Sequence, residues 1–485
     1  MMVIENKATY LKREVLTRIA RLCYDDQLVD KVDKIPMLMI NRNSEPFRCC
    51  LYKDRAMIKF RTIASMGFDL SDEEKVDSSL ISEYASEIPN RVKPEFPILT
   101  FIDDACKACV QVNYFITNVC KNCVARPCMV NCPKDAIYLD HYQAHIKPKD
   151  CVNCGICQKV CPYHAIVYVP VPCEESCPVD AMFKDENGKE NIDYTKCIFC
   201  GKCTKACPFG AIMEKSQIVD IIYKIKQKKE VIAMLAPSVI GQYKASIFQI
   251  ASALKKCGFT KVVEVAIGAE KTAQVESEEF LERMARGDKL LGTSCCPAYT
   301  AAVRKHVPEF LPFISEAKTP MAFTAEMVKN DYKDCVSVFI GPCVAKKHEG
   351  RKNEYVDYVI TYEEMHSMFE AKDLDPEKIE QNDEDKIGLL EYRDANNEGR
   401  GFPVTGGVAN AVKISLKDMF SDLKPVYIDG ITEKTVKLLS IYATKSCPGN
   451  LVEVMSCEGG CMAGPGVIEK TAKAAKRLND FIQNI

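Results

Sequence analysis

Three cysteine-bearing segments in the last third of the chain contain residue types that could do redox chemistry. They read Thr293-Ser-Cys-Cys-Pro-Ala-Tyr299, Gly341-Pro-Cys-Val-Ala-Lys-Lys-His-Glu349 and Glu453-Val-Met-Ser-Cys-Glu-Gly-Gly-Cys461. Four well-separated thiolates suit a buried 4Fe-4S cubane around which a domain folds, and glycines let the backbone approach such a cluster. A lysine also lies close to one of these thiolates. The segments therefore predict a buried cluster site in this part of the chain.

A second group of cysteines recurs between Cys106 and Cys207, a segment that holds 16 of the 27 cysteines. The repeating unit is Cys-x-x-Cys-x-x-Cys-x-x-x-Cys-Pro. In bacterial ferredoxins three thiolates come from one tight loop, and the fourth precedes a proline in the partner repeat. This arrangement predicts three clusters, held by Cys120, Cys123, Cys128 and Cys161, by Cys151, Cys154, Cys157 and Cys132, and by Cys197, Cys200, Cys203 and Cys177. Several zinc sites are the alternative, but the Cys-Pro punctuation and the interleaved symmetry favour iron-sulfur clusters.

Four cysteines of the same segment are left over, and they form one further ligand set. They are Cys106, Cys109, Cys173 and Cys207. We predict a fourth accessory cluster there. The alternative is that Cys106 and Cys109 are structural thiols and that the chain carries three accessory clusters. A string of cubanes passes electrons one at a time, so any substrate chemistry must lie in the last third of the chain or in a partner.

The rest of the chain must supply the elements that position these cysteines. Residues 1–100 place apolar side chains at helical spacing and predict a mainly helical N-terminal region of unknown role. Residues 101–213 are turn-rich and predict ferredoxin-like α+β iron-sulfur domains whose core is supplied by clusters. Residues 214–485 contain the β-branched runs 231–235 and 336–340, which are typical of buried strands, and they predict an α/β catalytic domain.

Two further segments complete this expected organisation. Residues 245–258, ASIFQIASALKKCG, have the spacing of a helix that packs beside the buried strands. The charged run 372–386, KDLDPEKIEQNDEDK, is most simply a solvated surface insertion.

The composition of the chain argues against several classes of protein. The 485 residues carry 65 Lys and Arg against 67 Asp and Glu, a net charge of -2, so no overall field attracts nucleic acid or an anionic membrane. The chain has no uncharged apolar stretch of about 18 residues, and charges interrupt its N-terminus, which argues against a membrane span or a signal peptide. We therefore expect a soluble, cytoplasmic protein whose cysteines bind metal rather than form disulfides.

In this combination the sequence resembles the iron-iron (FeFe) hydrogenases. Their signature is the three motifs TSCCP, PCxxKxxE and ExMxCxxGC, which this chain carries in that order behind ferredoxin-like repeats, over about residues 101–485. The resemblance implies the H-cluster fold and a cubane held by Cys296, Cys343, Cys457 and Cys461. It also implies that Cys461 bridges to a two-iron subcluster bearing CO, cyanide and an azadithiolate. Cys295 would then be free to pass protons to the bridging amine.

The resemblance assigns other residues around the diiron site. Lys346 would bind a cyanide ligand, since an ammonium can stabilise an anion in a buried pocket. Ala236, Pro237 and Ser238 would line the opposite side. Phe402 and Met455 look like part of the apolar shell, although ordinary core packing explains them equally well.

A proton path also carries over from the family. Glu279, Glu282 and Arg286 reproduce its Glu-x-x-Glu-x-x-x-Arg spacing, and Ser315 lies where its relay serine would be, upstream of Lys318-Thr319-Pro320. The stretch from this helix to the TSCCP motif is shorter than in the family. A solvated charged face is therefore an equally good interpretation of Glu282 and Arg286.

Several positions depart from the family pattern. Tyr299 replaces a Trp, Gly341 a Met, Met321 a Gln, and residues 463–466 a glycine triplet. The ligand set is intact, so these changes point to a divergent subgroup with an altered shell around the cluster.

The resemblance implies an enzyme that interconverts protons and electrons with H2, exchanges electrons with a ferredoxin-type carrier and receives its diiron cofactor from maturation proteins. One alternative is a hydrogenase-like protein of iron-sulfur assembly without a diiron site. Others are an H2 sensor and a pure polyferredoxin, which the last third of the chain argues against.

Overall fold

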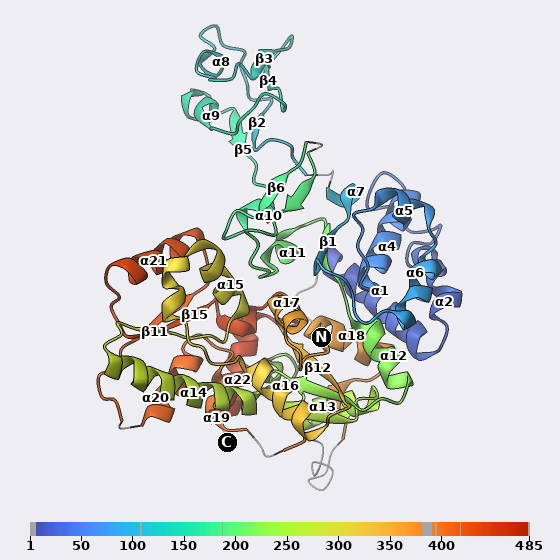
Figure 1. Ribbon diagram of the computed structural model, residues 1–485. Coiled ribbons are helices and arrows are strands. Elements are labelled where there is room, and N and C mark those ends of the chain that lie inside the picture. Colours follow the sequence, from blue (N-terminus) through green and yellow to red (C-terminus); the bar gives the residue numbers. More distant parts are fainter. Residues whose placement is uncertain are drawn as a thin grey trace.

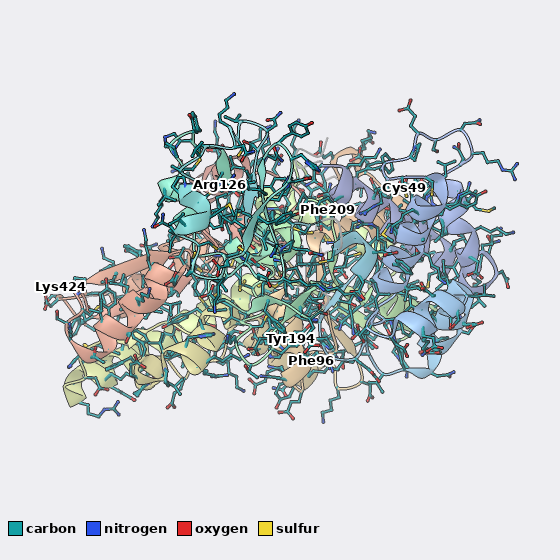
Figure 2. The ribbon with its side chains drawn as sticks, turned by 90° about the horizontal axis from the view of Figure 1, so that it is seen from above. Cys49, Phe96, Arg126, Tyr194, Phe209 and Lys424 are labelled. Carbon is teal, nitrogen blue, oxygen red and sulfur yellow. The ribbon has the colours of Figure 1, made fainter. Side chains whose placement is uncertain are left out.

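The computed structural model describes residues 6–106, 109–186, 188–380, 390–392, 395–417 and 419–483. Figure 1 shows a helical N-terminal region, a narrow cluster segment that projects outward, and a large C-terminal region of helices and sheets. Seen from above, Cys49 in the connection between the N-terminal helices α3 (Ile35–Met39) and α4 (Leu51–Ser65) and Lys424 in the C-terminal region lie toward opposite ends of the molecule (Figure 2). None of the described helices is long and apolar enough to cross a membrane.

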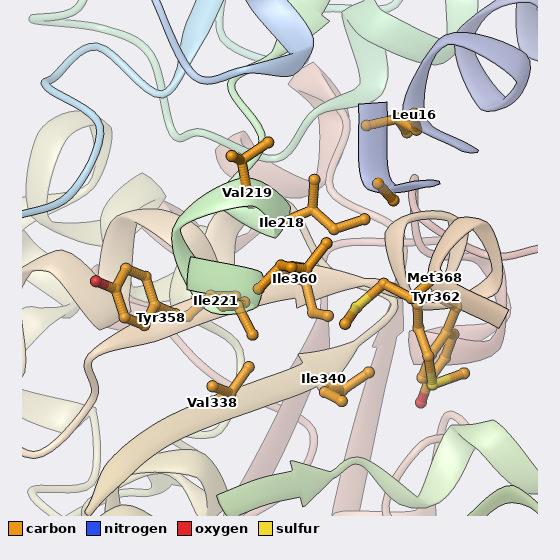
Figure 3. Close-up of a cluster of buried hydrophobic side chains, with 14 of the residues drawn as sticks. Leu16, Ile218, Val219, Ile221, Val338, Ile340, Tyr358, Ile360, Tyr362 and Met368 are labelled. Atoms are coloured by element: carbon orange, nitrogen blue, oxygen red, sulfur yellow. The ribbon is translucent and has the colours of Figure 1, made fainter. Parts of the chain in front are cut away.

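The N-terminal region is helical, as predicted from its apolar spacing. Its longest helix, α1 (Lys7–Tyr24), begins after Asn6, whose side chain accepts a hydrogen bond from the backbone N–H of Thr9. The other α-helices are α2 (Leu28–Lys31), α3 (Ile35–Met39), α4 (Leu51–Ser65), α5 (Glu73–Ser78) and α6 (Ile81–Glu87). Leu16 of α1 belongs to the same buried cluster as Ile218 and Met368 (Figure 3). The N-terminal helices therefore share a core with the C-terminal region.

The cluster segment is built from three-residue strands and single helical turns. Its antiparallel pairs are β1 (Leu99–Phe101) with β8 (Ile212–Glu214), β2 (Tyr114–Ile116) with β5 (Ile166–Tyr168), β3 (Ile137–Leu139) with β4 (Ala144–Ile146), and β6 (Met182–Lys184) with β7 (Glu190–Ile192). Its helices are α7 (Asp103–Cys106), α8 (Pro127–Val130), α9 (Ile156–Val160), α10 (Pro172–Glu175) and α11 (Lys202–Ala206). Strands β1 and β8 come from the beginning and the end of the segment, so their pairing brings its two ends together.

The C-terminal region contains two parallel sheets, in agreement with the predicted α/β class. The larger sheet has the order β10 (Lys261–Glu264), β9 (Val231–Leu235), β12 (Val336–Gly341) and β13 (Tyr358–Thr361). The smaller sheet has the order β11 (Leu291–Gly292), β15 (Leu451–Met455) and β14 (Pro425–Asp429). Every residue of β9 is buried, as expected for a parallel strand covered on both faces.

Helices cover these sheets. They are α12 (Ile218–Lys226), α13 (Ile247–Lys256), α14 (Val265–Arg286), α15 (Pro297–His306), α16 (Pro320–Asp331), α17 (Ala345–Lys352), α18 (Tyr362–Ala371), α19 (Asn397–Gly401), α20 (Gly407–Leu416), α21 (Glu433–Thr444) and α22 (Thr471–Gln483). The helix predicted within 245–258 is α13. Of the charged run 372–386, the described part 372–380 is mainly exposed and contains one 3-10 turn, Pro376–Lys378, whereas 381–386 lie outside the described residues.

Candidate active site

The candidate active site lies where strands of both parallel sheets end. Ala236 directly follows β9, Cys343 follows β12, Thr293 follows β11 and Ser456 follows β15. Ligand sites of parallel sheets form at the carboxyl ends of strands. The loops enclose an apolar cavity of about 100 Å³. Its lining includes Ala236, Pro237, Ser238, Cys295, Cys296, Cys343, Lys346, Phe402, Met455, Cys457 and Cys461.

Four thiols at this cavity form a suitable donor set for a cubane. Burial raises the pKa of Cys343 to about 11, and it raises the pKa values of Cys457 and Cys461 well above the usual range. Each of these three thiols also interacts electrostatically with Cys296, so four thiolates could not persist here without a cation. Iron-sulfur ligation displaces such protons and supplies the missing charge. The residues present therefore fit a 4Fe-4S cluster.

A glycine allows the last ligand to approach. Gly460 has a φ of +69°, and a Cβ atom at this position would lie 2.3 Å from the carbonyl oxygen of Pro403. The backbone N–H of Cys461 donates to the same oxygen at 2.7 Å. The glycine of the third motif is thus required for the turn that places Cys461 in the cavity wall.

Lys346 contributes a buried cation to the same wall. Its Nζ lies 2.7 Å from Oε2 of Glu349, and Thr319 donates to the other oxygen of that carboxylate. Burial acts to lower the pKa of Lys346, but the Glu349 carboxylate, together with Cys343 and Cys295, outweighs burial and raises this pKa overall. The ammonium therefore stays charged where an anionic ligand could be bound.

The opposite wall is held by a tyrosine that the sequence analysis did not single out. Ser238 is buried, and its hydroxyl lies 2.6 Å from the hydroxyl of Tyr362 on α18. Tyr362 also donates to the carbonyl oxygen of Ala236 at 3.0 Å. Because α18 is more than 120 residues away in sequence, no local pattern could have revealed this contact.

Carboxylates on α14 connect the site toward the surface. Ser315 donates to Oε2 of Glu279 at 2.6 Å, and Nε of Arg283 donates to Oε1 at 2.8 Å. One turn earlier, Glu276 accepts hydrogen bonds from the backbone N–H of Ser294 at 2.8 Å and from its hydroxyl at 3.1 Å. Burial raises the pKa of Glu276 to about 8. Its second oxygen, Oε2, is buried without a hydrogen-bond partner among the described residues.

The structure does not bring Glu282 and Arg286 into this group. Glu282 is exposed, and Arg286 pairs with Asp288 at the surface. The spacing Glu-x-x-Glu-x-x-x-Arg fits equally well three residues earlier, at Glu276, Glu279 and Arg283. Burial therefore favours the earlier set of three residues over the later set that contains Glu282 and Arg286. The short stretch between α14 and the TSCCP motif was the feature of the sequence that could have indicated this shift by three residues.

Gly341 lies beneath an aromatic ring. A Cβ atom at this position would lie 2.6 Å from Cε1 and 2.8 Å from Cζ of Phe339, two residues earlier on the same face of β12. The Phe339 ring is buried and lines the cavity. An aromatic ring therefore occupies space beside residue 341, where the family pattern has a methionine.

Gly341→Met is expected to lower the apparent melting temperature of the anaerobically reconstituted protein, because overpacking of this kind costs about 1–3 kcal/mol. Phe339→Ala alone also destabilises by leaving a cavity. In the double variant the methionine can enter the space left by the ring, so the two losses should be clearly less than additive. Strictly additive losses would contradict the proposed exchange of side chains.

The structure brings the accessory cysteines together in four groups. In each group one thiol interacts electrostatically with the other three. We name them the tip site (Cys120, Cys123, Cys128, Cys161), the neck site (Cys132, Cys151, Cys154, Cys157), the middle site (Cys106, Cys109, Cys173, Cys207) and the proximal site (Cys177, Cys197, Cys200, Cys203).

These groups lie at different places relative to the cavity. Helix α8, which carries Cys128 of the tip site, lies farther from the C-terminal region than α9, which carries Cys157 of the neck site (Figure 1). Cys203 of the proximal site interacts with Cys173 of the middle site. Cys200 of the proximal site interacts with Cys457 and lines the cavity itself. The middle and proximal sites thus connect to the cavity, whereas α8 and α9 lie farther out in the cluster segment (Figure 1).

Comparisons with known proteins agree with this arrangement. Residues 229–465 match the family described as iron only hydrogenase large subunit, C-terminal domain, and residues 144–167 and 190–213 match the 4Fe-4S binding domain. The chain is 30% identical over 369 residues to the periplasmic Fe hydrogenase large subunit of Nitratidesulfovibrio vulgaris, covering 63% of this chain and 87% of the relative. It is 28% identical to iron hydrogenase 1 of Clostridium pasteurianum, covering 49% of this chain and 50% of the relative.

More distant similarities include a protein with another role. A cytosolic Fe-S cluster assembly factor of Xenopus tropicalis is 22% identical, covering 48% of this chain and 59% of the relative. Among solved structures, a variant FeFe hydrogenase of Chlamydomonas reinhardtii aligns with a TM-score of 0.43 and 18% identity, covering 54% of this chain and 88% of that chain. With 30% identity across 87% of a hydrogenase large subunit, the chain belongs to the iron-only hydrogenase family, as a divergent member.

Proposed function

We propose that the protein is an FeFe hydrogenase that interconverts two protons and two electrons with H2. The observation that carries this proposal is the thiol of Cys295, which lines the same cavity as the four cluster ligands and Lys346 without belonging to the ligand set. When bound, a diiron subcluster would supply an open iron and an adjacent amine base for heterolytic H2 cleavage. Lys346 would hold a cyanide ligand from one wall, and Ala236, Pro237 and Ser238 would close the other.

The chain's own residues would move the proton. Burial raises the pKa of Cys295 well above its usual range, so its thiol keeps a proton that it can donate. Cys295 also interacts electrostatically with Glu276, whose pKa of about 8 suits a group that both accepts and releases protons near neutral pH. Glu279 and Ser315 would continue the path outward. The proton path would therefore reach the protein surface on the side of α14.

Electrons would leave through the proximal, middle, neck and tip sites in that order, to a ferredoxin-type carrier. The electrostatic interaction between Cys200 and Cys457, and the place of Cys200 in the cavity lining, support the proximal site as the first step. An assembly protein without a diiron site is the second candidate, because an assembly factor is among the relatives.

Infrared spectroscopy of the protein loaded with a diiron subcluster separates these functions. CO and cyanide bands together with H2 evolution from reduced methyl viologen would support the hydrogenase. Cubane signals without such bands would support the assembly protein. Bands with negligible turnover would instead indicate an H2 sensor.

Anaerobic reconstitution without maturation factors is expected to give five cubanes, or about 20 Fe per chain, because the chain offers five sets of four thiols. Cys106→Ser should lower the iron content by the equivalent of one cubane. Iron and sulfide analysis with electron paramagnetic resonance of the reduced protein measures this. A content near 16 that does not change in Cys106→Ser would remove the middle site from the proposal.

A further inference from the structure

The loop around the tip site presents apolar side chains to solvent. Val124 is 98% exposed, Val130 79% and Val119 51%. All three lie within residues 119–130, the stretch that also holds the proposed cluster ligands Cys120, Cys123 and Cys128. Exposed apolar side chains that form one patch mark interaction sites, and the closeness of these three valines in sequence suits such a patch.

The proximal site has an equivalent loop, which holds Cys197, Cys200 and Cys203. This loop packs against the C-terminal region, so it shows which residues of such a loop make contacts. Gly201, which follows Cys200, packs so closely that a Cβ atom there would lie 2.9 Å from Val344 and from Pro465 of the C-terminal region. The neighbouring Ile198 is buried in a cluster of C-terminal core residues. The proximal loop therefore contacts the next redox site through the residues that separate its cysteines.

The tip loop is longer at that same place. Four residues, 124–127, separate its second and third cysteines, whereas Gly201 and Lys202 alone separate those of the proximal site. The longer loop begins with Val124, the counterpart of Gly201. Gly201 of the proximal loop contacts the C-terminal region, whereas its counterpart in the tip loop, Val124, has a larger side chain that is exposed to solvent.

The charge of the tip loop indicates the kind of partner. Residues 117–131 contain Lys121 and Arg126 and no Asp or Glu, although the whole chain has a net charge of -2. Both basic residues are exposed. A local basic patch of this kind steers an acidic partner during encounter.

We propose that residues 119–130 form the docking surface for a small acidic electron-carrier protein. The valines would contact the partner around its own redox group, and Lys121 and Arg126 would pair with its carboxylates. In each encounter the reduced tip cluster would lose one electron and the carrier would gain it, so two encounters would remove the two electrons of one H2. The direction of this transfer rests on the proposed function, but the docking surface does not.

The experiment compares the double variant Lys121→Glu, Arg126→Glu with the unmodified protein and with Lys434→Glu, an exposed lysine on α21. H2 oxidation is measured with an acidic bacterial ferredoxin and with methyl viologen, over a range of salt concentrations. The double variant should raise the KM for ferredoxin at least about 10-fold at low salt, since electrostatic steering is worth 10- to 10³-fold. Its rate with methyl viologen should not change, and Lys434→Glu should match the unmodified protein in both assays.

Binding is measured separately from turnover, by calorimetric titration of the reconstituted protein with ferredoxin. Weaker ferredoxin binding in the double variant supports the docking surface even if the protein proves inactive with H2, a result that would overturn the proposed function alone. Unchanged ferredoxin binding and KM in the double variant would overturn the docking surface. Equal weakening in Lys434→Glu would also overturn it, because the effect would then be one of overall charge.

Discussion

Cys295→Ala is expected to lower H2 turnover by about 10²- to 10⁴-fold while the CO and cyanide bands stay in place. The reason is that the Cys295 thiol lines the cavity and carries a proton, but it is not needed to complete the set of four ligands. Removal of the thiol should therefore interrupt proton transfer without disturbing the metal site. Infrared spectra and H2 production by the same sample measure both effects.

The neighbouring residue provides the control. Cys296→Ser should lose the H-cluster cubane and the infrared bands with it, because a hydroxyl is a poor substitute for a thiolate on iron. Cys295→Asp could recover part of the activity, since a carboxylate also carries protons. Full turnover in Cys295→Ala would mean that protons use another route. Loss of the bands in Cys295→Ala would mean that the roles of the two cysteines are reversed.

Glu276→Gln should lower turnover by a similar factor, about 10²- to 10⁴-fold, because an amide cannot take up and release the proton. Glu282→Gln on the same helix is the matched control and should leave turnover unchanged, since Glu282 is exposed. Measurement of both variants with reduced methyl viologen keeps electron delivery constant. A loss in Glu282→Gln alone would return the path to the later register of the motif.

The pH dependence of stability gives a second measurement on Glu276. Burial raises its pKa from 4.5 to about 8, so between these values the folded protein keeps a proton that the unfolded chain has lost. Its contribution to stability therefore falls as pH rises from about 4.5 to about 8. Glu276→Gln should flatten this part of the profile of melting temperature against pH, whereas Glu282→Gln should leave it unchanged.

The groups of cysteines that the structure brings together could be predicted from the sequence, because cysteine spacing within a tight loop places three of the four thiols close together locally. The buried strands β9 and β12 were predictable for a similar reason, since continuous β-branched runs have few other uses. The proton path proposed above could not be placed from the sequence, because α14 offers several glutamates and their spacing alone fits two registers. Only the packing of α14 against the loop at Ser294 distinguishes Glu276 from Glu282. Tyr362 reaches the site from a distant helix, so it was missed altogether.

The core shared by the N-terminal helices and the larger sheet bears on how the protein could be shortened. Leu16 packs in the same buried cluster as Ile218 and Ile360, and β1 completes a strand pair with β8. Lys12 adds ion pairs to Glu214 and Glu363, at 2.5 and 2.7 Å. A chain cut just before the first cluster ligand would expose this apolar surface and leave two buried carboxylates without their cation. The helices of unknown role therefore share their core with the larger sheet, and we expect that they could not be removed as a separate module in a shortened protein.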